Sequence, residues 1–173
     1  MLYRYYVEGE CEKKLINTFK TKADNREPIF ISGKVYVFNV LDQDFSINQF
    51  RDITEPTTLI LIYDTDQIDN EKKNRLKRNI DIALSRKRIK KIIHVQSVKN
   101  FEDEILRCSK IKRIDDIFNT QGANAFKRKF ISCDNIESKL KTLDFNFDKL
   151  WISKPNDLFF ASLLEKNGAD IKK

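Results

Sequence analysis

The stretch that decides the fold runs from Thr57 to Asp66 and reads TTLILIYDTD. Its first part, Thr57 to Tyr63, is continuously apolar or β-branched and shows no alternation with charged side chains, which predicts a strand buried on both faces. Strands of this kind belong to parallel sheets that are covered by helices. Asp64 and Asp66 follow at the carboxyl end of the expected strand. The stretch therefore predicts an α/β sheet with acidic side chains at its carboxyl edge.

Strand and helix patterns alternate on both sides of this stretch. On the N-terminal side, Leu2 to Val7 predicts a strand, Glu8-Gly9 a turn, and Glu12 to Lys22 a helix. The further elements expected up to residue 110 are β structure over Val35 to Val40, a short helix at Ile47, Phe50 and Ile53, a helix from Asn70 to about Arg88, a strand from Ile92 to Val98 and a helix from Phe101 to Cys108.

Beyond residue 110 the pattern is mainly helical. The helical pieces expected there are Ala125 to Phe130, Asn135 to Leu143 and Asp157 to Lys166. We therefore predict an α/β sandwich, Rossmann-type in its alternation of strands and helices, with a core over residues 1–110 and a helical C-terminal extension over 111–173 packed on that core.

The length and composition of the chain limit the classes of protein to which it can belong. The chain has 173 residues, of which 40% are hydrophobic and 34% charged, which excludes a disordered tail and fits one α/β domain. No apolar run approaches the roughly 20 residues needed to cross a bilayer, and the first residues read as a strand rather than a signal peptide. We therefore expect a cytoplasmic protein with no membrane partner.

Cysteine and histidine content excludes several kinds of site. Cys11, Cys108 and Cys133 are widely spaced and odd in number, so they suggest neither a zinc knuckle nor a disulfide framework. The single histidine, His94, lies inside the apolar run KKIIHVQSV, where we expect a structural role. A mechanism that needs two histidine ligands from one chain is excluded.

The net charge of +7 is concentrated in one segment. Residues 1–70 hold twelve acidic against eight basic side chains, whereas residues 71–91 hold ten basic against two acidic. An acidic region beside a basic one suits a metal-dependent enzyme that acts on a polyanion, although a basic helix face can also be merely solvated. The candidate nucleic-acid-binding residues are Lys72, Lys73, Arg75, Lys77, Arg78, Lys127, Arg128 and Lys129. The last three lie between Phe126 and Phe130, which form the one basic-aromatic patch that we consider for contact with bases.

Acidic side chains follow three of the predicted strands. Glu8 follows the first, with Glu12 one helical turn further on; Asp64 and Asp66 follow the third; and Glu102 begins the helix after the last strand. In a doubly wound sheet, ligands bind outside the carboxyl ends of the strands. Carboxylates gathered there repel one another unless a cation is present, and Mg²⁺ (or Mn²⁺) prefers oxygen ligands. These five residues are therefore candidate metal ligands, although single acids in such turns also serve as helix caps.

The same residues carry a resemblance to a known family. Val7-Glu8-Gly9-Glu10-Cys11-Glu12 after an N-terminal strand, together with Leu59-Ile60-Leu61-Ile62-Tyr63-Asp64-Thr65-Asp66, resembles the TOPRIM domain of topoisomerases, primases and OLD-family nucleases. The segment Ser97-Val98-Lys99-Asn100-Phe101-Glu102 makes the chain most similar to the OLD and RloB-like branch found in bacterial defence against phage. The resemblance covers roughly residues 1–110.

This resemblance implies both a topology and roles for individual residues. It implies a four-stranded, mainly parallel sheet in which the first and third strands are neighbours. Glu8 would act as general base or metal ligand, and Asp64 and Asp66 would hold Mg²⁺. Glu12 and Glu102 would complete a second metal position. A basic residue often accompanies such sites, and Lys154 is our candidate for a catalytic cation.

Three functional hypotheses follow. The leading one is a Mg²⁺-dependent nuclease that hydrolyses phosphodiester bonds of DNA or RNA, as the effector of a bacterial anti-phage system. The alternative is a non-catalytic nucleic-acid-binding or regulatory subunit. A third, a phosphatase-like domain with Asp64 as nucleophile, is disfavoured because the DxD pair of such domains follows the first strand, whereas here it follows the third.

The absence of an ATPase motif and the small size of the chain indicate which partners it could have. It contains no GxxxxGK[ST] P-loop, so an ATPase partner would have to be a separate chain. A small chain of this type can also form a homo-oligomer or dock on a larger partner through its C-terminal helices.

Overall fold

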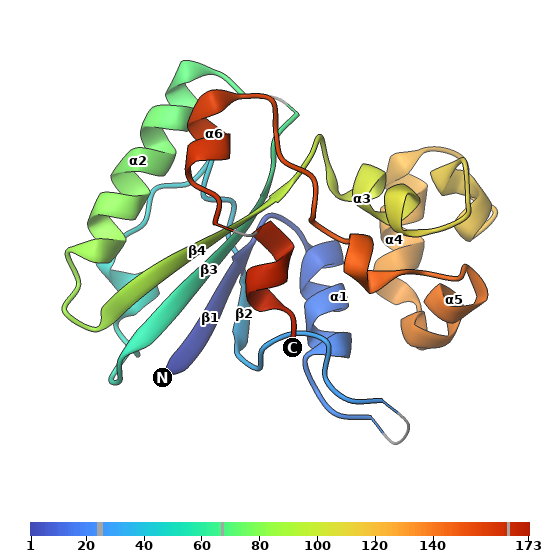
Figure 1. The fold of residues 1–173 in the computed structure, drawn as a ribbon, viewed down its shortest axis with the longest axis horizontal. Coiled ribbons are helices and arrows are strands. Elements are labelled where there is room, and N and C mark those ends of the chain that lie inside the picture. Colours follow the sequence, from blue (N-terminus) through green and yellow to red (C-terminus); the bar gives the residue numbers. More distant parts are fainter. Residues whose placement is uncertain (24–25, 67, 166) are drawn as a thin grey trace.

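The computed structural model describes residues 1–23, 26–66, 68–165 and 167–173. Within these ranges, four strands form one parallel sheet in the order β2-β1-β3-β4 (Figure 1). The strands are β1 (Leu2–Val7), β2 (Lys34–Val37), β3 (Thr57–Asp64) and β4 (Ile89–Ser97). The α-helices are α1 (Glu10–Phe19), α2 (Asn70–Leu84), α3 (Phe101–Cys108), α4 (Ala123–Ser132), α5 (Ile136–Thr142) and α6 (Leu158–Ser162). Short 3-10 helices are η1 (Ile47–Phe50), η2 (Ile114–Ile117), η3 (Phe147–Lys149) and η4 (Asn167–Ile171).

The α/β class and the predicted parallel sheet are confirmed. β3 lies between β1 and β4, and its residues from Thr57 to Tyr63 are all buried, as its unbroken apolar sequence predicts. β1 and β3 are direct neighbours, with Val7 opposite Ile62. The next residues along both strands, where the acids begin, are therefore brought to the same edge of the sheet.

Side chains of the strands alternate between two hydrophobic layers. In β3, Ile60 and Ile62 pack with α1, α3, α4 and α5, whereas Leu59 and Leu61 pack on the other face with α2 and α6. Figure 1 shows α2 on one side of the sheet and α1 with α3 to α5 on the opposite side. Because successive residues of a strand point to opposite faces, a continuous apolar strand serves both layers at once.

The C-terminal segment is part of the same fold and covers the outer edge of β4. The Asn167 side chain accepts a hydrogen bond from the Gln96 backbone N–H (2.9 Å) and donates to the carbonyls of Gln96 (3.3 Å) and Ser153 (2.7 Å). Gly168 lies so close to the preceding loop that a Cβ there would be 2.6 Å from the Trp151 Cβ. The asparagine amide thus replaces a neighbouring strand at one position of this edge.

Several predicted elements end earlier than expected. The helix expected to reach about Arg88 ends at Leu84, and the helix expected to reach Lys22 ends at Phe19. The β structure expected to reach Val40 ends at Val37, because the Asn39 side chain accepts the Leu41 backbone N–H (2.9 Å) and turns the chain. The helix expected from Asp157 to Lys166 ends at Ser162. Lys166 itself lies outside the described residues. No helix in the described part of the chain is both long and apolar enough to span a bilayer.

Replacement of Asn167 by alanine should destabilise the protein by roughly 2–4 kcal/mol, because it leaves the buried Gln96 N–H without a partner. Urea unfolding followed by circular dichroism measures this change. The exposed loop residue Asn156, changed to alanine as a control, should alter stability by less than about 0.5 kcal/mol. Equal effects of the two substitutions would show that the β4 edge does not depend on this amide.

Candidate functional site

The carboxyl ends of β1 and β3 are joined by an acidic side chain. The Glu8 Oε2 atom accepts a hydrogen bond from the Asp64 backbone N–H at 2.9 Å. The contact follows from the parallel pairing of β1 with β3. Val7 is opposite Ile62 in the last pair of this ladder, so Glu8, the residue after Val7, and Asp64, two residues after Ile62, lie close together. Two acids separated by 56 positions in the chain are thereby held side by side.

The loop after β3 is tied to the end of β4. The Thr65 backbone N–H donates to the carbonyls of Ser97 (3.1 Å) and Lys99 (2.8 Å), and its hydroxyl donates to Ser97 O at 2.8 Å. The Asn100 side chain caps α3 through the Asp103 N–H (3.0 Å) and also donates to Asp66 Oδ2 at 3.3 Å. The polar residue between the two aspartates therefore fixes the loop, while both aspartates remain directed to the edge of the sheet.

These side chains line a cavity of about 380 Å³ at the carboxyl edge of the sheet. Its walls come from the carboxyl end of β3, from the segments that follow β1, β2 and β3, and from α2, α3, η2 and α4, and they include five carboxylates and two lysines. The lining residues are Glu8, Asp42, Asp64, Asp66, Lys72, Asn100, Glu102, Ile114, Ala123 and Lys127. Four of the five predicted metal ligands are thus brought together.

The fifth predicted ligand, Glu12, lies behind the cavity wall and is not one of its lining residues. It is 4% exposed, and its Oε2 accepts the Gly9 backbone N–H at 3.1 Å, which caps α1. Glu102 faces the cavity from the first turn of α3 and pairs with the Lys127 ammonium group, with 3.1 Å between Glu102 Oε1 and Lys127 Nζ. Lys127 was predicted to contact nucleic acid. In the structure it lines the acidic cavity, where its ammonium group pairs with Glu102.

Burial and mutual repulsion raise the pKa values of the acids at this site. Burial, with the negative charges of Glu8 and Glu12, raises the pKa of the Asp64 carboxyl to about 9. Burial also raises the pKa of Glu12 to about 7. For Glu8, burial raises the pKa above its ordinary value even though the Asp64 N–H lowers it. The charged forms of these carboxylates are therefore disfavoured unless positive charge enters the cavity.

The chemistry of the donors fits a hard divalent cation. Asp64 Oδ1 is buried and has no hydrogen-bond partner, and Glu8 is fixed next to the same residue. Within the described ranges, no three carboxylate, thiol or imidazole side chains converge closely enough to form a complete metal cage. Mg²⁺ needs only one or two direct carboxylates, because water and substrate oxygens complete its octahedron. Glu8 and Asp64 are therefore the residues that would hold such an ion.

The basic side chains of α2 are largely engaged within the protein. Its ion pairs are Lys72 with Asp42, Lys73 with Asp157, Arg75 with Glu71 and Asp44, and Arg78 with Asp44. Lys77 Nζ lies 5.1 Å from the ring centroid of Phe159. Of these five residues only Lys72 lines the cavity. Apart from the i,i+4 pair of Glu71 with Arg75, the sequence alone could not reveal these pairings, because the other acidic partners are distant in the chain.

Other predicted contacts lie away from the acids. Lys154 is exposed in the loop after Trp151 and is not among the residues that line the cavity. Arg128 and Lys129 are exposed on α4. The expectation of a stacking surface at Phe126 and Phe130 is wrong, because both rings are fully buried in the core.

Two polar residues that line the cavity were missed by the sequence analysis. Asn100 could have been found, since an asparagine before Phe-Glu-Asp-Glu is a typical helix N-cap signal. Asp42 belongs to the loop after β2, and only the turn made by Asn39 brings it to the same edge. His94 is buried in β4 with Nδ1 3.1 Å from the Tyr63 hydroxyl, and burial lowers its pKa to about 4, as suits a structural residue.

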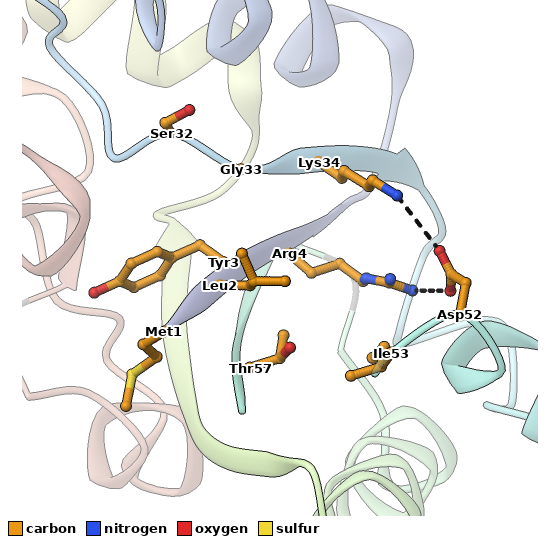
Figure 2. Close-up of a pocket in the computed structure, with 10 residues that line it drawn as sticks. All are labelled: Met1, Leu2, Tyr3, Arg4, Ser32, Gly33, Lys34, Asp52, Ile53 and Thr57. Atoms are coloured by element: carbon orange, nitrogen blue, oxygen red, sulfur yellow. Dashed lines mark hydrogen bonds and ion pairs between the residues drawn. The ribbon is translucent and has the colours of Figure 1, made fainter. Parts of the chain in front are cut away.

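A second cavity of about 380 Å³ lies at the opposite, amino-terminal edge of the sheet (Figure 2). Figure 2 shows Arg4 and Lys34 both directed toward Asp52, with closest contacts of 2.8 Å and 3.7 Å. The remaining lining is mainly apolar or backbone. Because its cations already share an acidic partner and no pair of carboxylates faces it, this cavity is a weaker candidate than the acidic one.

Comparison of the chain with protein-family models, with curated proteins and with solved structures gave no match. The features of the chain that bear on its function are therefore its parallel 2-1-3-4 sheet and the acidic cavity at the carboxyl edge of that sheet.

The raised pKa values predict how stability depends on pH in the absence of divalent ions. Between the ordinary carboxyl pKa of about 4 and the raised value, the folded chain keeps a proton that the unfolded chain has released, so stability falls as the pH rises. For Asp64 this range extends to about pH 9. His94 acts in the opposite direction below about pH 6.5, because burial lowers its pKa to about 4 and the unfolded chain then holds the extra proton. We therefore expect the melting temperature in EDTA to fall between about pH 6.5 and pH 8.

The Asp64→Asn variant should lose most of this pH dependence and melt higher than the wild type at pH 8, by roughly 2–4 °C for each kcal/mol of relieved repulsion. Asp81 lies exposed on α2, so Asp81→Asn serves as the matched control and should follow the wild-type curve. Parallel curves for wild type and Asp64→Asn would contradict the electrostatic account.

Proposed function

We propose that this chain is a Mg²⁺-dependent nuclease of the TOPRIM type, which hydrolyses phosphodiester bonds of DNA or RNA. The observation that supports it most is the contact between Glu8 and the Asp64 backbone, with Asp64 Oδ1 buried and unpartnered beside it. The sheet order and the positions of Glu8, Asp64 and Asp66 agree with what the resemblance implies. A role as effector of a bacterial anti-phage system belongs to the same proposal.

The residues around the cavity suit the handling of a phosphate. When bound, Mg²⁺ would polarise a phosphate oxygen and lower the pKa of a bound water. Lys72 and Lys127 come from helices on opposite faces of the sheet and both reach the cavity, so either ammonium group can hold a phosphate oxygen. Glu8 is fixed by the Asp64 N–H and can accept a proton from an attacking water.

One observation favours a second candidate function. The basic side chains of α2 are paired with acids of the same chain, which leaves fewer free cations on that helix for a long polyanion. This favours a module that binds an ion and a partner complex without rapid hydrolysis, such as a regulatory subunit of a separate ATPase.

The experiment that tests the nuclease proposal is incubation of purified protein with plasmid, single-stranded DNA and tRNA in Mg²⁺ or Mn²⁺. We expect cleavage that EDTA abolishes and that Glu8→Gln or Asp64→Asn lowers by at least about 100-fold, as for loss of a group that stabilises transition-state charge.

Matched controls separate the site from general charge loss. Glu10 is exposed two positions from Glu8, and Asp81 is exposed on α2. Glu10→Gln and Asp81→Asn should therefore cut at the wild-type rate. Cleavage that survives Glu8→Gln and Asp64→Asn would point to a contaminating nuclease, and ion binding without any cleavage would favour the regulatory alternative.

A further inference from the structure

We propose that the Lys127 ammonium group occupies the second cation position of the acidic cavity, beside Glu102, so that the native chain binds one divalent ion, at Glu8 and Asp64. This inference rests on the proposed function, because it assumes that the cavity holds a divalent ion at all. It departs from the two metal positions that the resemblance implies, and the reason lies in where α4 places its lysine.

The contact between Lys127 and Glu102 occupies the wall of the cavity at which the resemblance implies a second ion. Lys127 Nζ lies 3.1 Å from Glu102 Oε1, and the Glu102 side chain is only 12% exposed. The Glu102 carboxylate has little exposed surface, and the ammonium group already lies against it. Little room is left there for another cation. A second ion beside Glu102 would also be repelled by the lysine charge.

The position of Lys127 is fixed by the packing of its helix. Phe126 and Phe130, one residue before it and three after it, are both fully buried and set the rotation of α4. The Cys11 thiol on α1 lies 3.9 Å from the Lys127 carbonyl, so the helix backbone is held against α1 as well. Lys127 therefore cannot leave Glu102 by a rotation of α4.

The Lys127 side chain itself is less constrained than its backbone. It is 47% exposed, so removal of its amino group should open the position without disturbing the core. At the other end of the cavity the charge pairing differs. Asp64 Oδ1 and Glu102 Oε1 are both buried and accept no hydrogen bond of standard geometry, but Glu102 Oε1 has the Lys127 ammonium group beside it, whereas the nearby Lys72 pairs with Asp42 at 3.6 Å rather than with Asp64.

The test is a titration of the purified, metal-free chain with Mn²⁺, followed by calorimetry for the number of ions and by electron paramagnetic resonance for their environment. We expect one ion per chain in the wild type and two in Lys127→Met, which keeps an unbranched side chain of similar length but has no charge. Two ions about 3.5–4 Å apart should also broaden the six-line Mn²⁺ signal by magnetic coupling.

Matched variants show whether Glu102 is the ligand that Lys127 covers. Lys129 is exposed on the same helix, and Lys129→Met should bind one ion, like the wild type. The double variant Glu102→Gln/Lys127→Met should return to one ion, because the exposed carboxylate is removed again. Circular dichroism of each variant checks that the fold is retained.

The outcomes separate this inference from the proposed function. Two ions in the wild type, or one ion in both the wild type and Lys127→Met, would overturn the role of Lys127 and leave the metal-dependent site standing. Absence of Mn²⁺ binding in the wild type and in Lys127→Met would overturn the metal site and the inference together.

Discussion

The candidate site depends on one hydrogen bond, from the Asp64 backbone N–H to the Glu8 carboxylate. It exists because β1 and β3 are parallel neighbours, so that their carboxyl ends meet at one edge of the sheet. The loop after β3 is then anchored to β4 through Thr65, and the cavity walls assemble around it. If the first and third strands were not adjacent, the acids would be single turn residues with no common purpose.

Two buried carboxylates in this chain show how a structural acid differs from a candidate metal ligand. Glu104 is fully buried, and it accepts the backbone N–H groups of Val98 and Trp151 and pairs with Arg107. Its charge is therefore balanced, and it fastens the C-terminal segment to the core. Asp64 is also largely buried, yet its Oδ1 atom has no partner and its pKa is raised to about 9. A buried acid with one oxygen atom left without a hydrogen-bond partner is what a cation site needs.

Much of the fold could be predicted from sequence because local patterns determine it. The unbroken apolar run Thr57 to Tyr63 indicates a parallel strand buried on both faces. The acids that directly follow β1 and β3, and the acid in the first turn of α3, lie together at the carboxyl edge of the sheet, as predicted. The position of Glu12 behind the cavity wall could not be predicted, because its capping of Gly9 depends on the exact start of α1.

Long-range charge pairing was the main feature that the sequence concealed. Lys127 was predicted as a nucleic-acid contact from its basic neighbours, but its pairing with Glu102 arises only when α4 packs beside α1 and α3. Lys154 was chosen as the cation near the acids, whereas Lys72 and Lys127 line the cavity. Such pairings join residues far apart in the chain and leave no periodic signal.

The central claim is that Glu8 and Asp64 together hold a divalent ion at the carboxyl ends of β1 and β3. A crystal of the chain soaked in Mn²⁺ and measured for anomalous scattering tests it most directly. The account predicts a peak about 2.0–2.3 Å from an oxygen of Asp64, with Glu8 as a direct or water-mediated ligand. A fully occupied ion elsewhere, with Asp64 Oδ1 still unpartnered and no peak beside Glu8, would contradict it.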